Sequence, residues 1–96
     1  MPLLQITQPD KEDKLTFNLS DAKIRIGRSI ASELQLDDSS VSRDHAFVYP
    51  SGDNYLIEDV GSMNGVWLNG QRIDKPEILQ NRDHIMIGDF ELVFLR

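Results

Sequence analysis

Three short polar stretches interrupt the apolar segments of this 96-residue chain, and their side chains have the chemistry to bind an anion. In Val41–His45, a hydroxyl, a guanidinium fork, a carboxylate and a titratable ring follow one another. Gly27–Ser29 and Gly61–Gly65 are similar in character. None of the three builds a core, which is typical of functional loops. We predict that these loops converge on one bound anion.

The composition limits the class of protein and its partners. The chain has no cysteine, which excludes a disulfide scaffold and thiolate zinc sites and favours the cytoplasm or another reducing intracellular compartment. The formal net charge of −6 argues against nucleic acid or an anionic membrane as a partner. We find neither a signal peptide nor an apolar run of membrane-spanning length. An anion site here must therefore gather its few cations locally.

Short alternating segments separated by turn signals predict an all-β sandwich or barrel. Apolar residues make up 40% and charged residues 27%, and the length fits one domain over residues 1–96, which we expect to be cut from a longer protein. No window has a reliable helical period, and Asn69–Gly70 is a strong hairpin signal. The expected strands cover residues 3–7, 15–19, 23–26, 34–36, 46–49, 55–58, 66–68, 71–73, 84–87 and 90–95, with 77–80 ambiguous.

Several motifs together resemble the signature of the forkhead-associated (FHA) domain family. They are Ile26-Gly27-Arg28, Ser42-Arg43-Asp44-His45, Gly61–Gly65 and Asn69–Gly70, followed by a closing hairpin at Asp83–Gly88. The resemblance extends over almost the whole chain. It implies a twisted antiparallel β-sandwich of two sheets, with about 10–11 short strands and the binding loops at one end. It also implies a non-enzymatic, cofactor-free adaptor that binds phosphothreonine in a partner protein or peptide, and hence a Ser/Thr kinase in the pathway.

The resemblance gives six residues a role in binding the phosphopeptide. Arg28 would supply a charge-assisted fork to the phosphate, Ser42 a hydroxyl donor and Arg43 a second cation. Ser62 would help to complete the phosphate cradle, and Asn64 would bond the peptide backbone beside the phosphothreonine. The sixth is Met63, which together with Val66 stands where the family often has Thr; these two are candidates to line a pocket for the threonine methyl or to touch flanking peptide residues.

Five further residues would support the loops under the same resemblance. They are Gly27, His45, Gly61, Gly65 and Asn69. Gly27 lacks a Cβ and lets the chain come close, whereas His45 would pin one loop to another. Arg82 departs from the pattern, because Gly is common at that position; since Arg disfavours a positive φ, we expect a different turn type there. We expect the isolated domain to be a monomer.

Other interpretations of the same residues remain open at this point. The domain could instead be a scaffold that binds an unphosphorylated partner. Ser42, His45 and Asp44 or Asp59 could suggest a hydrolytic triad, but no Gly-x-Ser-x-Gly elbow is present. The two histidines do not have a metal-ligand spacing, and we expect His84 on the solvent face of a strand. The arginines in the motifs could also be surface cations that balance nearby aspartates.

Overall fold

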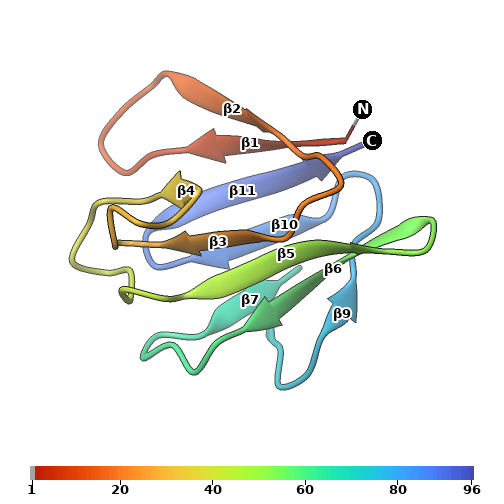
Figure 1. Ribbon diagram of the computed structural model, residues 1–96. Coiled ribbons are helices and arrows are strands. Elements are labelled where there is room, and N and C mark those ends of the chain that lie inside the picture. Colours follow the sequence, from red (N-terminus) through yellow and green to blue (C-terminus); the bar gives the residue numbers. More distant parts are fainter. Residues whose placement is uncertain (1) are drawn as a thin grey trace.

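The computed structural model describes residues 2–96, which form eleven β-strands (Figure 1). No helix within these residues is long and apolar enough to cross a membrane. The strands are β1 (Leu3–Thr7), β2 (Lys14–Asn18), β3 (Ile24–Gly27), β4 (Leu34–Gln35), β5 (Ala46–Ser51), β6 (Asn54–Asp59), β7 (Val66–Leu68), β8 (Gln71–Arg72), β9 (Glu77–Ile78), β10 (His84–Ile87) and β11 (Phe90–Leu95).

The strands pair into two sheets, which confirms the predicted all-β sandwich. A six-stranded sheet has the order β2-β1-β11-β10-β7-β8, and a five-stranded sheet has the order β4-β3-β5-β6-β9. The antiparallel expectation needs one correction, because β3 and β4 are parallel, with Ile26 opposite Leu34. The loop between them carries the chain back along β3, so this pairing is not a hairpin. The ambiguous segment at 77–80 contains β9, which pairs with β6.

Alternation of apolar and polar residues places one face of each sheet in the core. In β11, for example, Phe90, Leu92 and Phe94 are buried, and the residues between them are half-buried. The side chains from both sheets form a single hydrophobic cluster. β2 departs from this pattern, because it is an edge strand in which Leu15 is exposed.

The Asn69–Gly70 turn joins β7 to β8, as the sequence predicts. Both residues have positive φ, 51° and 85°, which is the conformation of a tight hairpin turn. The Asn69 side chain also reaches the neighbouring turn: its Nδ2 donates to Asp83 Oδ1 at 3.0 Å, and its Oδ1 accepts from His84 N at 2.9 Å. Asn69 therefore supports two turns at once.

The expectation of a different turn type at Arg82 is wrong. Arg82 keeps a positive φ of 73° although it has a Cβ. Its N–H donates to Phe94 O at 2.7 Å, and Asp83 Oδ2 accepts from Gln80 N at 2.7 Å. These bonds within the turn and to β11 hold the backbone at a positive φ, which a residue with a Cβ would otherwise disfavour.

Two substitutions of Asn69 separate the contribution of its side-chain hydrogen bonds from that of its positive φ. We expect Asn69→Ala to lower the free energy of unfolding by about 2 kcal/mol, because it removes two hydrogen bonds and strains a positive φ. Asn69→Gly tolerates the φ and should therefore lose only about half as much. Urea denaturation of the two variants measures both values. An Asn69→Ala protein as stable as the wild type would contradict this account of the turn.

Candidate functional site

The three polar stretches occupy the β3–β4, β4–β5 and β6–β7 loops, which lie at one end of the sandwich, on the left in Figure 1. Ser42 is the meeting point. Its carbonyl accepts from Arg28 N at 2.9 Å, and its hydroxyl accepts from Met63 N at 3.0 Å. The predicted convergence of the loops is confirmed; the anion that they were predicted to bind stays a prediction.

His45 joins two of these loops from inside the protein. Its imidazole is fully buried, Nδ1 accepts from Ser42 N at 3.1 Å, and Nε2 lies 2.7 Å from Gly65 O. Since Nδ1 accepts, the proton of the neutral ring is on Nε2 and is donated to the Gly65 carbonyl. The structure thus places His45 where the sequence expects a pin between the β4–β5 and β6–β7 loops.

Gly27 allows the β3–β4 loop to approach the β4–β5 loop closely. A Cβ at this position would overlap the carbonyl oxygen of Arg43. The next turn is fixed to the same carbonyl, because Ser29 N donates to Arg43 O at 3.2 Å. Gly27 is therefore required for a backbone contact, not for an unusual φ.

The β6–β7 loop is held by its own side chains. Asp59 Oδ1 accepts from Ser62 N at 2.8 Å, and Ser62 Oγ accepts from Gly65 N at 3.0 Å. Gly61 and Gly65 both have positive φ, 82° and 84°. Ser62 is only 7% exposed. Its geometry therefore favours support of the loop over the expected contact with a ligand.

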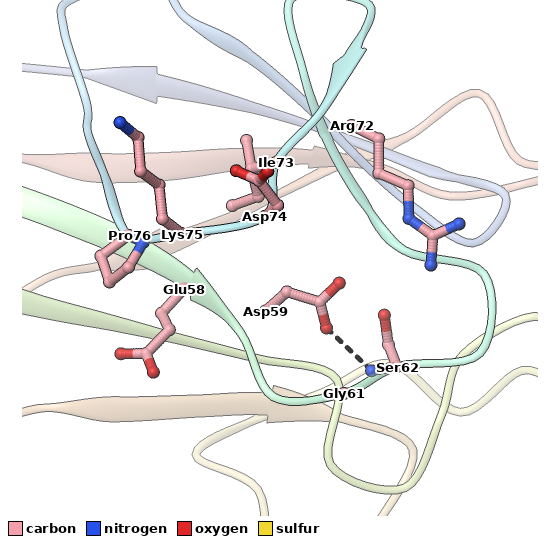
Figure 2. A pocket seen from close by; sticks show the side chains of 9 residues that line it. All are labelled: Glu58, Asp59, Gly61, Ser62, Arg72, Ile73, Asp74, Lys75 and Pro76. Atoms are coloured by element: carbon pink, nitrogen blue, oxygen red, sulfur yellow. Dashed lines mark hydrogen bonds between the residues drawn. The ribbon is translucent and has the colours of Figure 1, made fainter.

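Behind this loop lies a hollow of about 420 Å³, drawn in Figure 2. Ser62 lines it together with the end of β6 and the segment that follows β8. The lining mixes both signs of charge, with three carboxylates and two cationic side chains, so it does not select an anion. The residues are Glu58, Asp59, Gly61, Ser62, Arg72, Ile73, Asp74, Lys75 and Pro76.

Ser40 is a supporting residue that the sequence does not reveal. Its carbonyl accepts from Asn64 Nδ2 at 2.9 Å, and its hydroxyl donates to Asp38 Oδ2 at 2.5 Å and accepts from Asp89 N at 3.0 Å. The hydroxyl and the N–H of Ser40 lower the pKa of Asp38, so this carboxylate stays charged. Gly88 lies against Ser40 so closely that a Cβ would overlap it.

Trp67 is a second support that the sequence misses. Its side chain is half-exposed on β7, and its Nε1 donates to Asn64 O at 3.0 Å. Asn64 is thus held through its backbone carbonyl and through its side-chain amide, while its Oδ1 remains available as an acceptor. No spacing in the sequence signals this contact, because any aromatic residue fits the strand pattern.

We call Arg28, Ser42 and Arg43 the Arg–Ser cluster. Both arginines are exposed, and within residues 2–96 neither lies in ion-pair distance of a carboxylate. The nearby Asp44 pairs with Arg25 instead, at 3.5 Å. Arg28 is oriented by its Nε, which donates to Val41 O at 3.0 Å. The alternative that these arginines balance neighbouring aspartates therefore does not fit the structure.

Burial and bonding also bear on three further expectations. Val66 is fully buried in β7 and cannot line a ligand pocket, whereas Met63 is 86% exposed. Both ring nitrogens of His45 face backbone groups, so His45 is not placed to activate the Ser42 hydroxyl. Among the described residues, no group of three His, Asp or Glu side chains is arranged to hold a metal ion.

In this β-sandwich, hydrogen bonds join three loops at one end, beside two arginines that form no ion pair within the described residues. This is the architecture of a ligand-binding module. The FHA domain family model matches residues 24–88, and the chain belongs to the FHA domain family. The oxoglutarate dehydrogenase inhibitor of Corynebacterium jeikeium is 43% identical over 79 residues, which are 82% of this chain and 54% of that protein. The chain also matches the mycobacterial transcriptional regulator EmbR, but it covers only 20% of that protein.

Solved structures agree with this assignment. Mycobacterium tuberculosis EmbR in complex with a low-affinity phosphopeptide is 34% identical, with a TM-score of 0.82, over 97% of this chain and 24% of that one. A structure from work on phosphothreonine-dependent FHA domain interactions is 26% identical, with a TM-score of 0.84, over 98% of this chain and 96% of that one. These likenesses extend over both sheets and their loops.

The pin at His45 can be tested by removing its ring. We expect His45→Ala to lower the free energy of unfolding by about 3 kcal/mol, because it leaves a buried cavity and two backbone groups without partners. His84→Ala is the matched control: the His84 side chain is exposed and bonds only Glu91, so the loss should stay below about 1 kcal/mol. Equal melting temperatures for His45→Ala and the wild type would refute the pin.

Proposed function

We propose that this chain is a phosphothreonine-dependent peptide-binding module and not an enzyme. The observation that carries the proposal is the Arg–Ser cluster, in which neither arginine forms an ion pair within residues 2–96, on a chain of net charge −6. A guanidinium group that is exposed and has no ion-pair partner is suited to bind an external anion. Membership of the FHA family and the phosphopeptide bound by EmbR support this ligand. A Ser/Thr kinase would then have to act on the partner.

The phosphate would be bound by the three residues of the Arg–Ser cluster. A phosphothreonine carries about −1.5 to −2 charges and three acceptor oxygens, which matches two guanidinium groups and one hydroxyl. Ser42 Oγ already accepts from Met63 N, so its proton is free to be donated outward. Three hydrogen bonds of about 1.5–3 kcal/mol each, less the cost of association, correspond to micromolar affinity.

Asn64 would bind the peptide backbone next to the phosphothreonine. It is exposed, and Ser40 and Trp67 fix its orientation from both sides. With Nδ2 engaged by Ser40 O, its Oδ1 is the group that would accept a peptide N–H. A fixed amide loses little conformational entropy on binding, so this contact favours a single register of the peptide.

Single substitutions in this site should weaken phosphopeptide binding without unfolding the domain. We expect Arg28→Ala to lower the affinity by about tenfold to a hundredfold, and Ser42→Ala and Asn64→Ala by about tenfold each. Titration calorimetry with a phosphothreonine peptide measures the change, and thermal melting checks the fold. Arg82→Gly is the matched control, since it removes one positive charge at the far end of β11 and fits the positive φ.

The unphosphorylated peptide distinguishes this proposal from a phospho-independent scaffold. We expect it to bind at least a hundredfold more weakly, because the charged contacts have no counterpart. Equal affinity for both peptides, or unchanged affinity in Arg28→Ala, would contradict the phosphate-binding role and favour a scaffold.

A further inference from the structure

Two large apolar side chains are almost fully exposed at the loop end. Ile30 is 88% exposed and Met63 is 86% exposed, more than any other large apolar side chain among residues 2–96. An isolated exposed apolar residue needs no explanation. Here, however, Ile30 stands on the same β3–β4 loop as Arg28, and Met63 stands on the β6–β7 loop, where its N–H donates to Ser42 Oγ.

Both side chains are presented by turns that hydrogen bonds hold in place. Around Ile30, Ser32 N donates to Ser29 O at 3.0 Å, and Ala31 N donates to Ser29 Oγ at 3.1 Å. Met63 lies within the turn that Ser62 closes, and its own N–H is bound by Ser42 Oγ. A partner that covers these tips would therefore gain apolar burial without having to order the loops.

The two tips are each joined by a hydrogen bond to the Ser42–Arg43 segment. The Ile30 turn is joined to it through Ser29 N and Arg43 O, and the Met63 turn through Met63 N and the Ser42 hydroxyl. We infer that Ile30 and Met63 select a partner with apolar side chains flanking the phosphothreonine. This inference rests on the proposed function, because a phosphate bound by the Arg–Ser cluster would bring the flanking peptide residues close to both tips.

The charges at the loop end agree with an apolar partner and disfavour an acidic one. Asp37, Asp44 and Asp89 are exposed on the β4–β5 loop and the β10–β11 turn, both of which contact this end. Acidic residues that flank the phosphothreonine would be repelled by Asp37 and Asp89, whereas Asp44 is already paired with Arg25. The stiff, branched Ile30 should recognise shape more strictly than the flexible Met63.

Three phosphothreonine peptides test the inference, with leucine, alanine or aspartate at the two positions on each side. For the wild type, we expect the leucine peptide to bind about tenfold more tightly than the alanine peptide, and the aspartate peptide to bind most weakly. In the double variant Ile30→Ser and Met63→Ser, the ratio of leucine to alanine affinity should fall below about twofold. Ile78→Ser is the matched control, because Ile78 is half-exposed on β9 and should leave the ratio unchanged.

The outcomes separate this inference from the proposal on which it rests. If the alanine peptide binds only when phosphorylated, but leucine adds nothing, the selection by Ile30 and Met63 is refuted and the proposed function stands. A leucine preference that survives in the double variant, or a preference for aspartate, also refutes it. If no phosphorylated peptide binds the wild type, both the proposed function and this inference fail.

Discussion

The buried imidazole of His45 is the interaction on which the loop end depends. It accepts from the backbone of Ser42 and donates to the carbonyl of Gly65, so two loops that are far apart in the chain share one rigid support. The Gly65 carbonyl is buried and the Ser42 N–H is partly buried, so both would be costly to leave unpaired. The ring thus fixes the spacing between the Ser42 hydroxyl and the Met63–Asn64 turn before any ligand arrives.

Electrostatics at this end act over a short range. The body of the protein is acidic, yet two arginines near Ser42 have no carboxylate within ion-pair distance in the described part of the chain. At physiological ionic strength, charges are screened beyond about 8 Å. Acidic residues elsewhere in the protein therefore weaken the long-range attraction of an anion more than they weaken its direct contacts with the arginines. A doubly charged group would be held chiefly by the fork geometry of the guanidinium groups and not by the overall field.

Periodicity predicted most of the strands, because residues that alternate in polarity also alternate between core and solvent. It could not predict that β4 runs parallel to β3, since this depends on how a loop returns across the sheet. Family motifs placed the loop residues, but a serine has the same chemistry whether it contacts a ligand or supports a loop. Only the burial and hydrogen bonds of Ser62 in the structure showed that it favours support. Ser40 escaped prediction because its partner Asp89 lies 49 residues away. At Arg82, bonds to the rest of the fold overrode the local preference.

The contact between Gly88 and Ser40 makes the last hairpin a support of the loop end. A Cβ at Gly88 would overlap Ser40, and the Ser40 carbonyl in turn orients the Asn64 amide. A bulkier residue in that distant turn would displace Ser40 and tilt Asn64, although the turn itself need not contact the peptide. Affinity could thus drift through changes that leave every ligand-binding side chain intact, so the identity of those side chains alone does not guarantee a competent domain.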